Sequence, residues 1–434
     1  MTSFICKPGG SVSGEIRVPG DKSISHRSVM LASIAEGVSH ISGFLQGEDS
    51  LNTIAAFRQM GVKIERKLDR VTVNGVGLHG LQQPVEDLDM GNSGTAMRLL
   101  LGLLAGQNFD SCLIGDSSLS TRPMQRVIAP LQSMGAVIES ETGGRAPLRI
   151  RGGQALAAID YDMPVASAQV KSCLLLAGLY ASGETVVREP APTRDHSERM
   201  LRGFGCEVKA ENGEIRLRGK QVLESCDIDV PADISSAAFF MVAASIAEAG
   251  EITLQHVGIN PTRTGVIDIL KLMGADIEIL NRREIGGEPV ADIRLRSAAL
   301  KGIDIPQQLV PLAIDEFPVL FVAAACAEGS TRLSGAEELR VKESDRIQVM
   351  ADGLNSLGIE VEVKADGIVI QGGKIGAATV DSRGDHRIAM AFSVASLAAS
   401  GEIRILDCAN VNTSFPGFAE LARQTGLRIS IDEE

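Results

Sequence analysis

The sequence predicts an α/β protein of two similar domains, each built from three βαβαββ repeats. An Ala/Leu-rich helical segment that ends on glycine occurs six times at intervals of 67 to 79 residues, with its last residue at Gly37, Gly106, Gly183, Gly250, Gly329 and Gly401. Each is followed by a more amphipathic helical segment and then an alternating, strand-like run, and the glycines at these junctions are Gly61, Gly135, Gly205, Gly274, Gly358 and Gly426. A chain of 434 residues exceeds what one hydrophobic core usually supports, so we expect the six repeats to form two groups of three.

The domain boundary is predicted near the middle of the chain. The fourth repeat begins at Val230, in VPADISSAAFF. One domain is therefore expected to span residues 21–229, and the other residues 1–20 plus 230–434, closed by the amino-terminal strand. No Pro/Gly/Ser-rich linker marks this boundary, so two short, strand-like crossings are expected.

Composition excludes several classes of protein. Aromatic residues make up 3% of the chain and there is no Trp, whereas Gly is abundant at 46 residues, which favours α/β layers with Ala-rich helices over an all-β sandwich. The formal net charge of −13 opposes a nucleic-acid-binding surface, because phosphate contacts require Lys and Arg. The seven Cys are scattered without a CxxC pair, so we expect reduced core thiols rather than disulfides or a zinc site. The absence of a long uncharged apolar run predicts no membrane span, no secretion and a cytoplasmic location.

The start of the first Ala-rich helix carries an unusual group of polar side chains. In VPGDKSISHRSVMLASIAEG, Ser23 and Arg27 are four residues apart, as are Lys22 and His26, so each pair shares a helix face. Cations and a hydroxyl beside free backbone N–H groups suit a phosphate or a carboxylate. A capped surface helix with solvated charges would have the same sequence.

Two further repeats place polar residues at the equivalent turn. In GNSGTAMR, Gly94 allows a ligand to approach the backbone closely, and Arg122 follows in STRPMQR. In VASAQVKS, Ser167 and Gln169 precede a helix and can form hydrogen bonds with hydroxyls or phosphate. Ordinary helix capping would also explain these residues.

The C-terminal half supplies candidate acid/base groups. Asp315 and Glu316 stand directly before an apolar run, where a carboxylate is either a helix cap or a general base. In RVKESDRI, Lys342, Glu343 and Arg346 lie within about one helical turn, a pattern that fits an acid/base group among cations or an exposed ion-pair face.

The last repeat and one loop complete the candidates. SRGDHRIAM brings Arg387 to another helix start, with Asp385 and His386 beside it. The loop that carries Arg194, Asp195 and His196 is interpreted either as a lid or as an exposed turn.

Five cations occupy equivalent turns in an otherwise acidic protein: Lys22, Arg27, Arg122, Arg346 and Arg387. Together with the hydroxyls and carboxylates, they predict a site for two anionic small molecules, at least one of which bears a phosphate.

The motifs also support a family resemblance. PGDKSISHR, GNSGTAMR, RPM, SAQVKS, DEFPVL, RVKESDRI and DHRIAM occur in the order found in the 5-enolpyruvylshikimate-3-phosphate synthases of the enolpyruvyl transferase family, which the chain resembles over essentially its whole length. The resemblance implies an inside-out α/β barrel in each domain, with the active site in the interdomain cleft. It also implies transfer of the enolpyruvyl group of phosphoenolpyruvate to the 5-hydroxyl of shikimate 3-phosphate, through a tetrahedral intermediate, with release of phosphate.

The resemblance assigns roles to residues of this chain. The residues implied to bind shikimate 3-phosphate are Lys22, Ser23, Arg27, Ser167, Gln169, Asp315 and Lys342. Those implied to bind phosphoenolpyruvate are Lys22, Gly94, Arg122, Gln169, Arg346 and Arg387. Asp315 is implied to be the general base, with Glu343 or Lys22 protonating C3 of the donor. No metal or organic cofactor, no nucleic acid and no membrane partner is expected, and we expect a monomer.

Two positions depart from the common family pattern. Thr413 stands where many members have Lys, and Leu99 stands where common members have Pro. Both are typical of a bacterial branch associated with herbicide tolerance, but Gly94 is not the Ala that excludes glyphosate. We therefore expect glyphosate to inhibit in competition with phosphoenolpyruvate.

Three other classes of protein remain as alternatives. UDP-N-acetylglucosamine enolpyruvyl transferases share the fold and donor but carry a reactive Cys where this chain reads DSSLSTRPMQ. RNA 3′-phosphate cyclase relatives have similar repeats, but the acidic charge of this chain opposes nucleic-acid binding. A non-catalytic repeat scaffold would not gather cations at equivalent turns.

Overall fold

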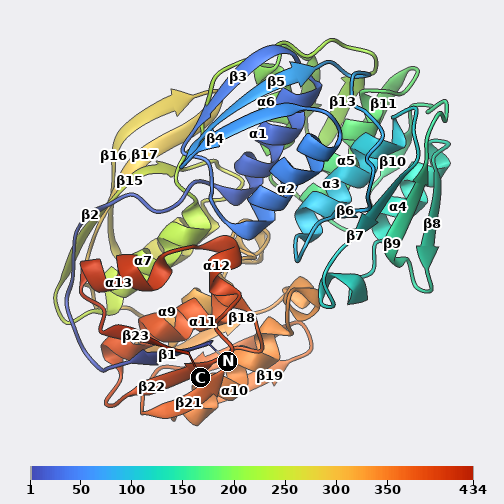
Figure 1. Cartoon of the computed structure of the whole chain (residues 1–434). Coiled ribbons are helices and arrows are strands. Elements are labelled where there is room, and N and C mark those ends of the chain that lie inside the picture. The colour runs from blue at the N-terminus through green and yellow to red at the C-terminus, as the bar shows by residue number, and fades with distance from the viewer. Residues whose placement is uncertain (1, 434) are drawn as a thin grey trace. The chain divides into compact units, whose positions relative to one another are not determined.

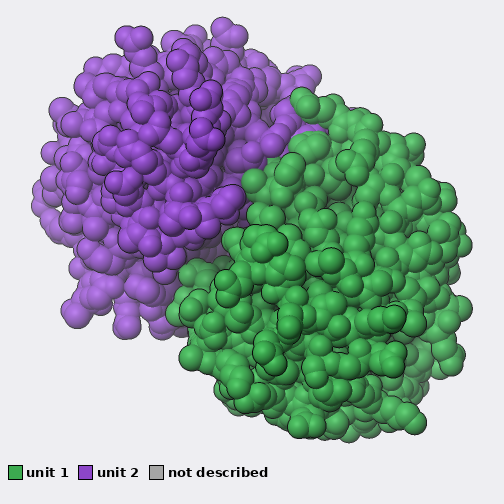
Figure 2. Space-filling model, turned by 180° about the vertical axis from the view of Figure 1, so that it is seen from behind, with its two compact units in different colours: residues 1–19, 231–284, 289–434 green, residues 20–230, 285–288 purple. Residues whose placement is uncertain are grey.

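The chain folds into two α/β units, as the six repeats predict. A computed structural model describes residues 2–433. Unit 1 holds Met1–Pro19, Pro231–Glu284 and Pro289–Glu434, and unit 2 holds Gly20–Val230 together with Ile285–Glu288 (Figure 2). The sequence placed residues 285–288 in the other domain. They join unit 2 because Glu288 Oε1 lies 2.7 Å from His196 Nδ1, and because the Gly287 carbonyl accepts a hydrogen bond from Arg199 at 2.7 Å.

In unit 2, the three Ala/Leu-rich helices lie inside and three four-stranded sheets lie outside them (Figure 1). The helices are α1 (Lys22–Ile34), α2 (Glu48–Gln59), α3 (Gly94–Ala105), α4 (Gln125–Ser133), α5 (Ala168–Gly178) and α6 (His196–Gly203). The sheets have the orders β14-β3-β5-β4, β6-β7-β9-β8 and β10-β11-β13-β12. Their strands are β3 (Glu36–Ser42), β4 (Lys63–Lys67), β5 (Arg70–Val76), β6 (Leu88–Asp89), β7 (Ser111–Ile114), β8 (Val137–Glu141), β9 (Arg145–Arg151), β10 (Asp160–Asp162), β11 (Glu184–Arg188), β12 (Val208–Glu211), β13 (Glu214–Arg218) and β14 (Ile228–Asp229).

Unit 1 also combines Ala-rich helices with three sheets, but one of its sheets has three strands, and strands come from both ends of the chain. Its helices are α7 (Ile234–Ile246), α8 (Gly265–Leu272), α9 (Phe317–Cys326), α10 (Arg346–Ser356), α11 (His386–Ala395), α12 (Val411–Ser414) and α13 (Phe418–Thr425). Its strands are β1 (Thr2–Cys6), β2 (Val12–Ile16), β15 (Gly250–Gly258), β16 (Asp276–Ile285), β17 (Glu288–Arg296), β18 (Ser330–Leu333), β19 (Val361–Lys364), β20 (Gly367–Gln371), β21 (Ala378–Asp381), β22 (Ile403–Leu406) and β23 (Ile429–Glu433). β1 pairs antiparallel with both β22 and β23, and β2 pairs parallel with β15.

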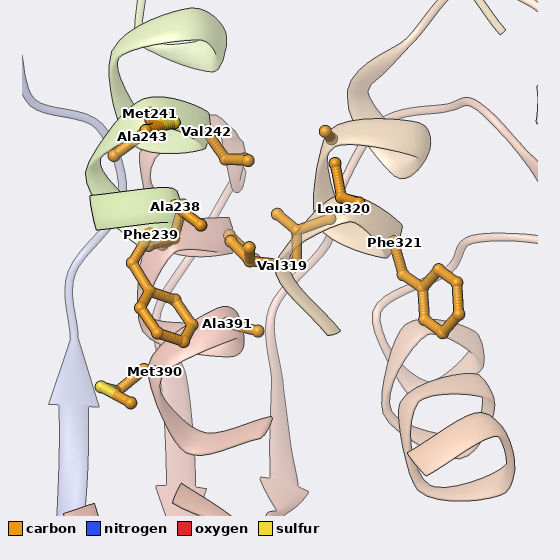
Figure 3. Packing of buried hydrophobic residues seen from close by; sticks show 14 of the residues in the cluster. Ala238, Phe239, Met241, Val242, Ala243, Val319, Leu320, Phe321, Met390 and Ala391 are labelled. Atoms are coloured by element: carbon orange, nitrogen blue, oxygen red, sulfur yellow. The ribbon is translucent and has the colours of Figure 1, made fainter. Parts of the chain in front are cut away.

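The core of unit 1 is formed where its Ala-rich helices pack together. Figure 3 shows side chains of α7, α9 and α11 in this cluster, among them Phe239, Val319 and Met390. These helices carry apolar residues on every face because sheets and neighbouring helices cover them from all sides. Their polar residues are therefore confined to their ends, where the candidate site residues lie.

The glycines at the helix-to-strand junctions confirm the predicted repeat. Gly61, Gly135, Gly205, Gly274, Gly358 and Gly426 all have φ between 85° and 115°. This left-handed conformation favours glycine and turns the chain from each amphipathic helix toward the next strand. The predicted stop of the first helix at Gly37 is wrong: α1 ends at Ile34, because Ala35 is already extended, and Gly37 lies within β3.

The cysteines form no disulfide, as expected from their scattering. All seven are free, and five of them are buried. Among residues 2–433, no helix is long and apolar enough to cross a membrane.

Candidate functional site

The helix starts of unit 2 hold a cationic group of residues. Asp21 caps α1 by accepting a hydrogen bond from the Ile24 backbone at 2.8 Å. The next residue, Lys22, forms an ion pair with Asp49 of α2 and remains partly exposed. Sequence reasoning did not single out Asp49, because 27 residues separate it from Lys22.

Arg27 is buried and donates to neutral oxygens. Its Nε donates to Ser197 Oγ at 2.7 Å, and its NH2 donates to Ser172 Oγ at 2.8 Å. Its NH1 donates to the Ser23 carbonyl at 3.0 Å, so the predicted Ser23–Arg27 relationship runs through the backbone of Ser23. Burial lowers the pKa of Arg27 to about 10, which leaves the guanidinium charged at neutral pH.

Gly94 lies between two guanidinium groups at the start of α3. A Cβ atom at Gly94 would lie 2.9 Å from NH1 of Arg98 and 3.4 Å from NH1 of Arg122. Arg122 is held by Asn92, whose Oδ1 accepts from NH2 at 2.8 Å. The missing side chain of Gly94 thus allows both guanidinium groups to lie close to the helix backbone.

Gln169, at the start of α5, forms hydrogen bonds with two residues of α3. Its Oε1 accepts from Arg98 NH1 at 2.7 Å, and its Nε2 donates to Thr95 Oγ1 at 2.9 Å. Ser167, which caps α5, accepts from the Val170 backbone at 3.4 Å. Arg98 was missed by sequence reasoning, although its position four residues after Gly94 placed it on the same helix face.

The loop with Arg194, Asp195 and His196 is interpreted from the sequence either as a lid or as an exposed turn. In the structure Arg194 and Asp195 are half-buried and His196 is buried. His196 is buried against Glu288, and Asp195 forms an ion pair with Arg199 at 2.8 Å. Next to His196, Ser197 accepts a hydrogen bond from Arg27, so this segment helps to hold the Arg27 guanidinium in place.

In unit 1, the predicted residues converge on the guanidinium of Arg346, which is 1% exposed. Its NH2 donates to Glu343 Oε2 at 2.6 Å, and its NH1 lies 3.4 Å from Asp315 Oδ1. Asp385, which caps α11, accepts from Nε at 2.8 Å. Burial acts to lower the pKa of Arg346, but the carboxylates of Asp385, Glu343 and Asp315 raise it overall.

Lys342 and Arg387 flank this carboxylate group. Lys342 Nζ lies 3.6 Å from Asp315 Oδ1, and the backbone N–H of Arg387 donates to Asp385 Oδ1 at 2.9 Å. Thr413 donates from Oγ1 to the Asn410 carbonyl at 2.7 Å. Asp385 becomes a functional candidate because it contacts Arg346. This contact could not be predicted from the sequence, because 39 residues separate the two side chains.

The structure thus separates the predicted residues into two chemical groups. Unit 2 carries the cationic and polar set of Lys22, Ser23, Arg27, Gly94, Arg122, Ser167 and Gln169. Unit 1 carries the set of Asp315, Lys342, Glu343, Arg346 and Arg387, in which carboxylates contact cations. The first set can bind phosphate and carboxylate groups, and the second can accept and donate protons. Within residues 2–433, no cluster of three or more His, Cys, Asp or Glu residues could hold a metal ion.

Comparisons with known proteins agree with this chemistry. The family described as EPSP synthase (3-phosphoshikimate 1-carboxyvinyltransferase) matches residues 6–421. The 3-phosphoshikimate 1-carboxyvinyltransferase of Alkalilimnicola ehrlichii is 65% identical over 98% of this chain and 96% of its own. That of Methylococcus capsulatus is 64% identical over 99% and 98%.

Solved structures give the same result. The EPSP synthase of Acinetobacter baumannii matches with a TM-score of 0.91 and 56% identity, covering 100% of both chains. The enolpyruvyl transferase NikO from Streptomyces tendae matches with a TM-score of 0.79 and 17% identity over 99% of both chains, and shares the fold. From the full-length sequence matches and the shared fold, we conclude that the chain belongs to the EPSP synthase family.

Proposed function

We propose that the protein transfers the 1-carboxyvinyl group of phosphoenolpyruvate to the 5-hydroxyl of shikimate 3-phosphate, releasing phosphate. This reaction is a step of the shikimate pathway toward chorismate and the aromatic amino acids. The observation that carries the proposal is the position of Gly94 between the guanidinium groups of Arg98 and Arg122. A small donor with both a carboxylate and a phosphate fits such a paired-cation site.

The proposed binding roles are those that the family resemblance implies. We assign shikimate 3-phosphate to Lys22, Ser23, Arg27, Ser167, Gln169, Asp315 and Lys342. We assign phosphoenolpyruvate to Lys22, Gly94, Arg122, Gln169, Arg346 and Arg387. The buried Arg27 supports the first assignment, because its charge is held by hydroxyl and carbonyl oxygens and can interact strongly with a phosphate dianion.

The reaction proceeds by addition and elimination. Asp315 accepts the proton of the 5-hydroxyl as its oxygen forms a bond to C2 of phosphoenolpyruvate, while Glu343 or Lys22 donates a proton to C3. In the elimination step, the residue that protonated C3 takes that proton back as the C2–C3 double bond re-forms. The C2–O bond to phosphate breaks, and the leaving phosphate takes up the proton held by Asp315. Positioning and charge stabilisation by the cations supply the main rate enhancement, and no metal or organic cofactor takes part.

The experiment that tests this function measures phosphate release. Phosphoenolpyruvate is supplied with either shikimate 3-phosphate or UDP-N-acetylglucosamine, in the presence of a chelator. We expect release only with shikimate 3-phosphate, and little release from the Asp315→Ala variant. Release only with the sugar nucleotide would keep the donor and overturn the acceptor, and no release with either acceptor would overturn the proposed activity.

The source of the C3 proton has its own test. Glu343→Gln is assayed for exchange of solvent hydrogen into C3 of phosphoenolpyruvate in the presence of shikimate 3-phosphate. Strongly reduced exchange would assign the proton to Glu343. Undiminished exchange would leave Lys22 as the donor. We further propose that the enzyme acts as a cytoplasmic monomer, which light scattering on the eluting protein would test for its oligomeric state.

A further inference from the structure

Glu316 follows Asp315 directly, yet its carboxylate lies in a different environment. Asp315 contacts Lys342 and Arg346, whereas Glu316 contacts Ser235 of α7 and Arg263 of the turn before α8. Glu316 is 2% exposed. Two adjacent acidic residues that look interchangeable in the sequence are therefore separated by the fold.

The cluster around Glu316 is buried and holds one cation beside two carboxylates. Ser235 Oγ donates to Glu316 Oε1 and accepts from Arg263 NH2 at 2.6 Å. The same NH2 lies 3.5 Å from Glu316 Oε1 and 3.5 Å from Asp233 Oδ1. One buried guanidinium thus stands between two carboxylates, with a hydroxyl as the bridge.

These contacts link the starts of two helices. Asp233 is the N-cap of α7 and accepts from the Ser235 backbone at 3.0 Å, while Glu316 is the N-cap residue of α9. The side chain of Glu316 is directed to Ser235 rather than to a backbone N–H of its own helix. A buried network of this kind stabilises one arrangement of its parts, because moving Glu316 would break both its hydrogen bond with Ser235 and its ion pair with Arg263 in a buried site.

We infer that Glu316 is a positioning residue, which fixes the peptide that carries Asp315 and so holds that carboxylate against Lys342 and Arg346. The inference rests on the proposed function, in which Asp315 is the general base. Glu316 does not touch the reactants. It acts through Asp315, whose carboxylate must lie within hydrogen-bond reach of the hydroxyl it deprotonates.

Glu316→Gln is the informative variant. The amide keeps an oxygen that accepts from Ser235 but loses the charge opposite Arg263. A displacement of a catalytic group by about 1 Å costs on the order of 100-fold in rate, so we expect kcat to fall by about 10- to 100-fold. The KM for phosphoenolpyruvate should change by no more than about twofold, because the donor residue Arg346 keeps its shorter contacts with Asp385 and Glu343. Glu360→Gln, at an exposed carboxylate of the same unit, is the matched control and should leave both constants unchanged.

A double-mutant cycle separates positioning from general structural damage. If Glu316 acts through Asp315, Glu316→Gln should cause little further loss of kcat in an Asp315→Asn background. Equal fold losses in both backgrounds would overturn the inference. If Glu316→Gln does not fold, Ser235→Ala removes the bridging hydroxyl while keeping the three charges, and the same cycle applies to it.

The outcomes distinguish this inference from the proposed function. Full activity of Glu316→Gln together with an inactive Asp315→Ala variant would overturn the positioning role and keep the base. Full activity of Asp315→Ala would instead overturn the assignment of the base.

Discussion

Arg346 donates from Nε to Oδ2 of Asp385 at 2.8 Å, and both side chains are almost completely buried. Asp385 also caps α11 through the backbone N–H of Arg387 at 2.9 Å. One carboxylate thus fixes the orientation of Arg346 and the start of the helix that carries Arg387. The two cations assigned to phosphoenolpyruvate in unit 1 share this support.

Replacing Asp385 by Asn should weaken donor binding while preserving the helix cap, because Asn is as good a cap as Asp. Hydrogen bonds to charged groups contribute about 1.5–3 kcal/mol, so we expect kcat/KM for phosphoenolpyruvate to fall by about 10- to 100-fold. Steady-state kinetics with the donor varied would measure this. Asp385→Ala is the comparison, since it also removes the cap and should lower the melting temperature further. Wild-type kcat/KM in Asp385→Asn would contradict the expected role.

Gly94→Ala should weaken the binding of both phosphoenolpyruvate and its competitor glyphosate. The new Cβ would approach NH1 of Arg98 to 2.9 Å, so that guanidinium must shift, and it would lie in contact with NH1 of Arg122 at 3.4 Å. We expect the KM for phosphoenolpyruvate to rise by about 10-fold, with a larger loss of glyphosate inhibition.

Inhibition assays over a range of phosphoenolpyruvate concentrations would measure both effects of Gly94→Ala. Gly203→Ala in α6 is the control, because a Cβ there meets nothing within 4 Å. An unchanged inhibition constant in Gly94→Ala would show that this glycine does not line the inhibitor's site. Non-competitive inhibition of the wild-type protein would contradict the expectation drawn from its sequence.

His26 should give the stability of unit 2 a dependence on acid pH. Burial lowers the pKa of His26 to about 3, and its ring nitrogens lie 2.8 Å from Thr53 Oγ1 and 3.4 Å from Ser93 Oγ. The unfolded chain binds a proton at His26 below about pH 6.5, whereas the folded chain does so only near pH 3. Stability from this residue is therefore complete above pH 6.5 and falls as the pH decreases toward 3.

The measurement is the urea midpoint of unfolding between pH 7 and 4. His26→Gln should lower the midpoint at pH 7. The pH dependence of its free energy of unfolding should correspond to about one proton fewer taken up on unfolding. His40→Gln, at an exposed histidine, should leave the slope unchanged. Equal slopes for the wild type and His26→Gln would mean that His26 is protonated in the folded protein at these pH values.

Lys171 should be essential for the stability of unit 2. It is fully buried, and its Nζ lies 2.7 Å from Glu198 Oε1 and 3.0 Å from Glu189 Oε1. Lys171→Met leaves two carboxylates buried without their cation, which costs about 3–5 kcal/mol. The melting temperature should fall by about 10 °C.

Lys63→Met is the matched control for Lys171→Met. Lys63 and Glu65 also form an ion pair at 3.0 Å, but both are largely exposed. An exposed pair contributes about 1 kcal/mol at most, so the melting temperature should hardly change. Similar melting temperatures for the two variants would show that burial does not determine the cost of losing this cation.

The repeat pattern predicted the fold because its physical causes are local. Helix periodicity, alternating strands and a glycine that needs positive φ all act within about ten residues of one another, so Gly61 and its equivalents marked the junctions correctly. The assignment of residues 285–288 failed for the opposite reason. Glu288 contacts His196, which is 92 residues away in the chain, and no local signal records that contact.

The same distinction applies to the candidate site. Gly94 and Gln169 belong to recognisable turns, so their positions could be predicted from sequence. Asp49 and Arg98 are defined by partners on other helices, Lys22 and Gln169. Asp315 and Glu316 contact different residues because their side chains leave the backbone in different directions. Composition and spacing do not predict these directions.

The pairing of β1 with β22 and β23 has a consequence for synthesis on the ribosome. The first strand of the chain lies between two strands that are made last, since its partners begin at Ile403 and Ile429. β1 therefore cannot pair with them until the residues of β22 and β23, from Ile403 onward, have been translated. During the synthesis of residues 7–402, β1 therefore has neither of its partners in the sheet, and its apolar side chains lack the contacts they make in the folded unit.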